Sequence, residues 1–278
     1  MNSSSMADGI HEDGREIWDV TTPPGGWGQP WPQCVELAQN LPAQHWTLVG
    51  GLMVQLHSAR AGLAVTRPTA DVDIVLHLET PATTVRQVQT ILAGMGYSLQ
   101  TSIDSSAPAH RFVRGKEQID VMVADRMAPR VPQRLAGHDM FALPAGTQAL
   151  QRTVYCRLTS GGGDGAQVLI SIPNVLGALV LKGAAFREDS RDTRRHLDDA
   201  VVLAACVQEP LTTRDQMKGS DRSRIIGLRE NLADQAHLSW MLLEDEARQR
   251  ARMALKVLSD NPQSTPKFQK FGKKELPN

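Results

Sequence analysis

Residues 46–79, WTLVGGLMVQLHSARAGLAVTRPTADVDIVLHLE, decide the fold that we predict for this chain. The apolar start of this stretch, 46–49, predicts a strand, and apolar residues at helical spacing follow Gly50 and Gly51. Glycines lack a Cβ and let a phosphate approach the backbone, while the unpaired N–H groups at a helix N-terminus attract anions. The glycine pair is therefore a candidate phosphate-binding turn between a strand and a helix.

Two aspartates follow in a second predicted strand, over 71–76. Alternation along a strand places Asp71 and Asp73 on one face, about 6 to 7 Å apart at a rise of ~3.3 Å per residue. Like charges this close repel unless a cation lies between them, and hard divalent cations such as Mg²⁺ prefer oxygen ligands. Beside a phosphate-binding turn, the pair predicts transfer chemistry on a nucleotide, with two metal ions roughly 3.5 to 4 Å apart holding the attacking and leaving oxygens.

The glycine pair followed by RPTADVD over 67–73 resembles the signature of the nucleotidyltransferase superfamily. The most similar group is the minimal bacterial one that includes the AbiEii-type toxins of abortive-infection and type IV toxin–antitoxin systems. The resemblance covers about residues 46–205, and it implies that Gly50, Gly51 and Thr69 contact the nucleotide. It departs from the common motif in one respect. Nineteen residues separate Gly51 from the first aspartate, a longer spacing that we interpret as a small insertion over 61–65.

A third acid is expected from a later strand. In the superfamily, a strand beside the one with the two aspartates supplies it, and Asp120 matches that pattern within a predicted strand over 118–123. Asp125, in the loop that follows, is a weaker candidate. The alternative for Asp120 is an exposed position on an edge strand.

A lysine lies inside a predicted helix over 173–187 that begins at its proline and is apolar nearly all round. Lys182 is costly to bury there unless an anion pairs with it, and a triphosphate or a carboxylate would serve. The resemblance implies that Lys182, Arg187 and an aspartate of the next helix contact the nucleotide. Asp199 matches that aspartate better than Asp198 because it directly precedes an apolar run. Alternatively, or in addition, Lys182 and Asp199 pair to fix the two helices together.

The composition is that of an ordinary globular protein. The chain has 278 residues, of which 41% are hydrophobic and 22% charged, and its formal net charge is zero. No overall field therefore attracts it to nucleic acid or membrane. Its three cysteines lack metal-ligand spacing, the first residues lack an apolar signal, and no run approaches the ~18 apolar residues of a membrane span. We expect a cytoplasmic protein without a membrane partner.

Four segments are expected: an irregular N-terminal arm over 1–32, a nucleotidyltransferase core over 33–172, a helical C-terminal part over 173–260 and a basic tail over 261–278. The arm contains three tryptophans, which either dock it on the domain or stack on a nucleotide. The last predicted helix covers 235–259. The tail alternates lysine with phenylalanine, so it is either disordered or able to hold an RNA backbone and stack a base.

These patterns predict an α/β (α+β) nucleotidyltransferase with a mixed sheet flanked by helices, which uses Mg²⁺ and a nucleoside triphosphate. Asp71, Asp73 and Asp120 would hold the metal, Lys182 would neutralise phosphate charge, and Asp120 would also accept the proton of the acceptor hydroxyl. The resemblance implies an RNA acceptor such as the 3′ end of tRNA, growth arrest as the outcome, and a cognate antitoxin as partner. Two alternatives remain open: an antibiotic-modifying nucleotidyltransferase with a small acceptor, and a non-catalytic nucleotide-binding or regulatory protein of the same fold.

Overall fold

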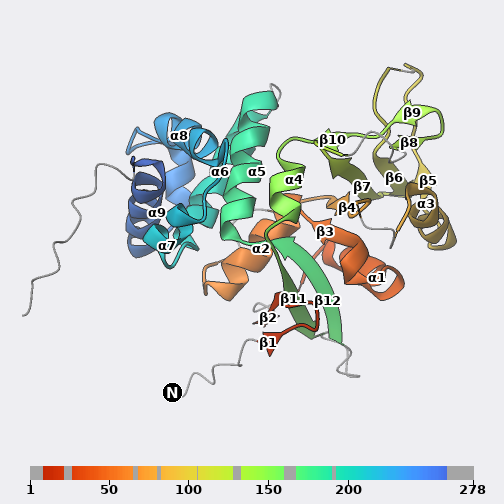
Figure 1. The fold of residues 1–278 in the computed structure, drawn as a ribbon, viewed down its shortest axis with the longest axis horizontal. Coiled ribbons are helices and arrows are strands. Elements are labelled where there is room, and N and C mark those ends of the chain that lie inside the picture. The colour runs from red at the N-terminus through yellow and green to blue at the C-terminus, as the bar shows by residue number, and fades with distance from the viewer. Residues whose placement is uncertain are drawn as a thin grey trace, which may run out of the picture.

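The computed structural model describes residues 9–21, 27–64, 68–79, 83–104, 106–127, 133–159, 167–189 and 192–261. Figure 1 shows a mixed α/β molecule in which strands and helices fill one side and a group of helices fills the other. The predicted fold class, a mixed sheet flanked by helices with a helical C-terminal part, is confirmed.

The central sheet has the strand order β3-β4-β7-β6-β5, and β10 also pairs with β7. These strands are β3 (Trp46–Leu48), β4 (Val72–Leu76), β5 (Ser98–Leu99), β6 (Arg111–Arg114), β7 (Glu117–Ala124) and β10 (Ala142–Leu143). β4 and β7 are parallel, whereas β3 with β4 and β6 with β7 are antiparallel. The two parallel strands are buried along most of their length, and apart from the aspartate in each and the first two residues of β7 their sequences are apolar.

A second sheet has the order β1-β2-β11-β12. β11 (Thr153–Thr159) and β12 (Gln167–Pro173) are antiparallel, and β2 (Glu16–Val20) pairs in parallel with β11 and antiparallel with β1 (Gly9–Ile10). The two N-terminal strands come from the segment that the sequence predicts to be an irregular arm, so that prediction is wrong for residues 9–20. β2 buries only two residues, which is too short a pattern to recognise among polar and glycine residues.

The described residues before β11 also form four helices and a small hairpin. They are α1 (Trp31–Asn40), α2 (Gly50–Arg60), α3 (Val85–Gly94) and α4 (Gly146–Leu150), with the 3-10 turn η1 (Ala43–His45) and the hairpin of β8 (Arg134–Leu135) and β9 (His138–Asp139). At the start of α1, Trp31 is buried and its indole N–H donates to Oε1 of Gln55 in α2 at 2.7 Å. The ring of Trp27 lies 4.3 Å from that of Trp31. These two tryptophans therefore dock residues of the predicted arm on the domain.

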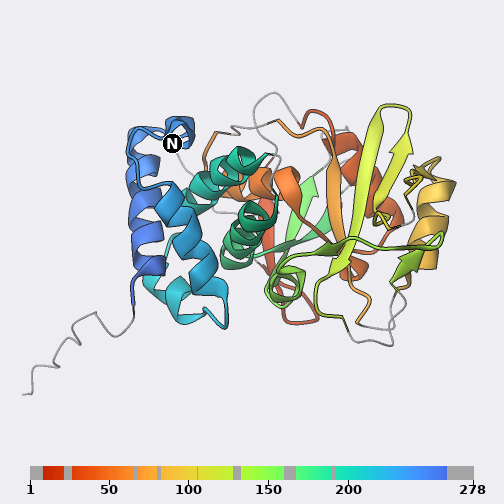
Figure 2. The same cartoon turned by 90° about the horizontal axis from the view of Figure 1, so that it is seen from above.

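The C-terminal part is a group of helices around α6 (Figure 2). They are α5 (Val175–Glu188), α6 (Thr193–Ala205), α7 (Pro210–Asp215), α8 (Asp221–Asn231), the 3-10 helix η2 (Leu238–Leu242) and α9 (Asp245–Ser259). α6 packs against α5, α8 and α9, and it also contacts α2 beside the central sheet. The helical part is thus joined to the sheet by packing of α2 against α6.

Two helix boundaries differ from the prediction. Pro173 ends β12, and α5 instead begins after Asn174, whose side chain caps it by accepting from the backbone N–H of Gly177 at 3.0 Å. The helix predicted over 235–259 is divided into η2 and α9 by extended residues between them. This break places Trp240 in the core, where its indole N–H donates to a backbone carbonyl.

No helix in the described ranges is long and apolar enough to cross a membrane. The three cysteines are free thiols. The basic tail from residue 262 onward and Arg67 of the predicted signature lie outside the described residues, so what the sequence predicts for them remains a prediction.

Candidate active site

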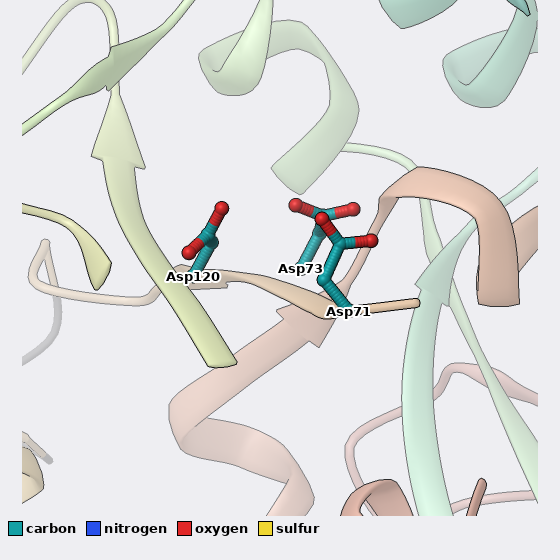
Figure 3. A group of neighbouring side chains, drawn as sticks. All are labelled: Asp71, Asp73 and Asp120. Carbon is teal, nitrogen blue, oxygen red and sulfur yellow. The ribbon is translucent and has the colours of Figure 1, made fainter. Parts of the chain in front are cut away.

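Three aspartates from two neighbouring strands meet on one face of the central sheet (Figure 3). Asp71 precedes β4, Asp73 lies within β4, and Asp120 lies within β7. Each offers a carboxylate oxygen, and these oxygens lie within 4.8 Å of one another. The structure therefore brings together the three acids that the sequence selects, and oxygen donors of this kind suit a hard divalent cation.

Strand pairing explains why the acids meet. Asp73 and Asp120 are direct partners in the parallel pairing of β4 with β7, so their side chains project next to each other from the same face. Asp71 lies two residues before Asp73, and alternation returns its side chain to that face. Val72 and Ile74 point the other way and are fully buried. The acids thus occupy the polar face of strands whose opposite face builds the core.

The glycine pair at the start of α2 lies against the acids. Gly50 has a φ of +67°, and a Cβ placed on it would lie 1.9 Å from Oδ2 of Asp73. A Cβ on Gly51 would lie 2.7 Å from the Cβ of Thr69. Both positions therefore need glycine because any larger residue would collide with a side chain of the site. The sequence pattern did not indicate this reason. The N-cap residue of α2, Val49, has no side chain that could cap the helix, so the first N–H groups of α2 are candidate donors to a phosphate.

Hydrogen bonds hold two of the acids in place. The hydroxyl of Thr69 donates to Oδ1 of Asp71 at 3.0 Å. The side-chain amide of Gln118 donates to Oδ2 of Asp71 at 3.3 Å and to Oδ2 of Asp120 at 3.2 Å, so it bridges two carboxylates. Arg111 binds Asp120 through two bonds, from Nε to Oδ1 at 3.0 Å and from Nη2 to Oδ2 at 2.9 Å.

The electrostatics of the cluster indicate a shortage of positive charge. Burial raises the pKa of Asp73 to about 7, and the negative charges of Asp71 and Asp120 contribute to this rise. The positive charges of Lys182 and Arg195 act in the opposite direction. Asp73 thus ionises with difficulty beside two other carboxylates. A divalent cation bound between them would relieve this repulsion and favour the ionised form.

Lys182 of α5 and Asp199 of α6 form a buried ion pair, with 2.7 Å between Nζ and Oδ2. Their side chains are only 8% and 2% exposed. The neighbouring acid Asp198 has different partners, because it accepts from the hydroxyl of Ser239 and lies 3.9 Å from Arg194. Of the two aspartates that the sequence left open, Asp199 is therefore the one that pairs with Lys182.

Two further residues from the sequence analysis lie in other surroundings. Arg187 is exposed, and its guanidinium contacts the backbone carbonyl of Ser223 in α8. Asp125 accepts from the backbone N–H groups of Ala145 and Thr147 at 3.2 and 3.0 Å, so it stabilises the start of α4. Asp120, and not Asp125, is thus the acid that joins the first two, and a contact of Arg187 with a nucleotide remains a prediction.

Sequence reasoning missed Arg111 and Gln118. Arg111 is the direct antiparallel partner of Asp120 in the pairing of β6 with β7, and Gln118 precedes Asp120 by two residues on the same face. The position of Gln118 could have been inferred by applying the alternation rule to β7. The position of Arg111 requires the register between two strands, which a single sequence does not supply.

No protein-family model and no curated protein matches this chain. Among solved structures, the fold of this chain is similar to the crystal structure of an antigenic nucleotidyltransferase-like protein from Paracoccidioides brasiliensis. The two share 15% identity with a TM-score of 0.46, over 77% of this chain and 89% of the other. So distant a likeness carries no functional argument.

Proposed function

We propose that this protein is a metal-dependent nucleotidyltransferase, which transfers a nucleoside monophosphate from a nucleoside triphosphate to an acceptor hydroxyl and releases pyrophosphate. The observation that carries the proposal is the meeting of Asp71, Asp73 and Asp120 at the N-terminus of α2. An acid cluster alone fits any divalent cation. An acid cluster against an uncapped helix N-terminus offers a cation and N–H donors to the same phosphate group.

The residues present fit a magnesium ion. Their donors are carboxylate oxygens within 4.8 Å of one another, and burial together with mutual repulsion raises the pKa of Asp73 to about 7. Asp71, Asp73 and Asp120 would hold the ion. When bound, Mg²⁺ would polarise a phosphoryl oxygen and neutralise the negative charge that develops on it during transfer.

The protein's own groups have separate parts in this proposal. The N–H groups of Gly50 and Gly51 bind the triphosphate, and Thr69 orients Asp71 through its hydroxyl. Lys182 adds positive charge close enough to act on Asp73. Asp120 accepts the proton that leaves the acceptor hydroxyl, since a carboxylate at hydrogen-bond distance from that hydroxyl can serve as a general base.

We further propose that the acceptor is RNA, such as the 3′ end of tRNA. Transfer to it would arrest growth, and a cognate antitoxin would be the partner. This proposal is supported by the resemblance of the glycine pair, the 67–73 segment and the Lys182 helix to AbiEii-type toxins. Arg187 and Asp199 belong to that resemblance as nucleotide contacts. The labelling of RNA is therefore tested separately from transfer itself.

The test is incubation of the purified protein with Mg²⁺ and each labelled nucleoside triphosphate in turn, in parallel reactions with total RNA and with small hydroxyl acceptors. We expect label on RNA, and we expect none with Asp73→Asn or after chelation of the metal. Asp104→Asn, which removes an exposed acid outside the site, is the matched control and should label as the wild type does. Label on a small acceptor alone would contradict the RNA acceptor, and no transfer from any nucleotide to RNA or to small hydroxyl acceptors would overturn the proposed function.

A further inference from the structure

Asp73, Asp120 and Arg111 form a row across three consecutive strands, β4, β7 and β6. The guanidinium of Arg111 is planar, and its two bonds to the carboxylate of Asp120 have the fork geometry that makes such pairs strong. The pair is unequally buried, because the Asp120 side chain is 8% exposed and that of Arg111 is 39% exposed. The arginine can therefore leave towards solvent, whereas the aspartate cannot.

Arg111 also interacts with the rest of the cluster. Both of its bonds to a carboxylate go to Asp120, whose carboxylate oxygen lies within 4.8 Å of those of Asp71 and Asp73. The guanidinium is thus a cation bonded to one of the three carboxylates that would hold a divalent ion, and the other two lie close to that one. A guanidinium and a divalent ion that share these carboxylates repel each other, so each binds more weakly when the other is present.

The lone pairs of Asp120 lead to the same conclusion. A carboxylate oxygen has two lone pairs, and Oδ2 of Asp120 already accepts from Arg111 and from Gln118. Oδ1 accepts from Nε of Arg111, so a metal ion that binds either oxygen of Asp120 comes next to the guanidinium, and at Oδ2 it also competes with both donors. Gln118 is neutral and also bridges to Asp71, so repulsion by the incoming ion acts on Arg111 much more strongly than on Gln118.

We infer that Arg111 is a positioning residue that holds Asp120 while no divalent ion is bound, and that metal binding displaces its guanidinium from this carboxylate. Arg111 therefore weakens binding of a metal ion that arrives alone. Once displaced, the guanidinium is a free positive charge beside Asp120 that suits an anion, and a phosphate of the substrate is the anion that this reaction brings. This inference rests on the proposed function, because it assigns a metal ion to the three acids.

The first test measures Mn²⁺ binding to the full-length protein without nucleotide, by calorimetry or by the electron paramagnetic resonance signal of free Mn²⁺. Arg111→Gln should bind Mn²⁺ at least about tenfold more tightly than the wild type, since it removes one positive charge next to the ion. Arg111→Lys keeps the charge and should remain within about threefold of the wild type. Arg114→Gln is the matched control, because Arg114 also lies in β6 and forks onto carboxylates, but those belong to Glu36 and Glu117. Its Mn²⁺ affinity should not change.

A second measurement needs no variant, and it decides the matter if Arg111→Gln fails to fold. The Nε–H resonances of arginine in the ¹⁵N-labelled wild-type protein can be followed during a titration with Mg²⁺. The Arg111 resonance should shift and exchange faster with water as the fork opens, while that of Arg114 stays fixed. Equal or weaker Mn²⁺ binding by Arg111→Gln, or an unmoved Arg111 resonance at saturating Mg²⁺, would overturn the inference and leave the proposed function standing. Absence of Mn²⁺ binding in every variant would overturn both.

Discussion

The buried pair of Lys182 and Asp199 allows a quantitative prediction. Lys182→Met keeps the length and the apolar stem of the lysine but removes the cation that lies 2.7 Å from Oδ2 of Asp199. Asp199 is only 2% exposed, so solvent cannot replace the lost charge. Breaking a buried pair by removing one partner costs about 3 to 5 kcal/mol, and we expect the free energy of unfolding to fall by that amount.

The assay is denaturant unfolding without nucleotide, with Lys182→Met, Asp199→Asn and the double variant compared. The double variant should recover much of the loss, because a neutral amide is less costly to bury beside methionine than a carboxylate is. Lys116→Met, at an exposed turn position, is the control and should change stability by no more than about 0.5 kcal/mol. A Lys182→Met protein as stable as the wild type would refute this reasoning and would leave phosphate binding as the main reason for the lysine.

The remaining predictions concern the glycine turn, the acids and a buried histidine. Gly50→Ala should abolish Mn²⁺ binding and destabilise the protein by more than Gly62→Ala does. Both glycines have a φ of +67°, but only the Cβ at Gly50 would overlap Asp73. Equal losses of stability in the two variants would show that backbone strain alone matters. Asp73→Asn should abolish transfer and leave the melting temperature unchanged or higher, since it relieves repulsion within the cluster; a lower melting temperature would show that the acid is structural. Burial lowers the pKa of His57 to about 4, so its contribution to stability is complete above pH ~6.5 and is lost as the pH falls towards 4, up to about 3 kcal/mol. His57→Gln should reduce the slope of stability against pH in that window without abolishing it, because burial also lowers the pKa of His77 to about 4; an unchanged slope would contradict the assignment.

The sequence predicted those features that depend on local pattern. The strand and helix on either side of Gly50 and the strand positions of Asp73 and Asp120 follow from apolar periodicity, which is set by burial on one face. The prediction failed where a few residues take their structure from a distant partner. Strand β2 exists because it pairs with β11, more than a hundred residues later, and nothing in its own composition indicates that partner.

The same distinction applies within the site. Asp73 and Asp120 could be selected from the sequence because each lies within an apolar strand, where a charge is conspicuous, and Asp71 follows from Asp73 by alternation. Arg111 could not, because arginine is ordinary on a half-exposed strand, and its role depends on the register that places it opposite Asp120. Predictions of single residues were therefore most successful where the residue type conflicts with its surroundings.

The charges of the site connect the proposed metal with the proposed role of Arg111. Among the described residues bonded to the cluster, Arg111 supplies the positive charge against three carboxylates, while the charge of Lys182 is largely balanced by Asp199. This leaves a surplus of two negative charges when all three acids are ionised, which is the charge that one divalent ion neutralises. If the ion also displaces Arg111, a positive charge becomes available where a triphosphate and an acceptor must meet. The site would then be attractive to a cation before it is occupied and to anions afterwards, and that order follows from where the charges lie.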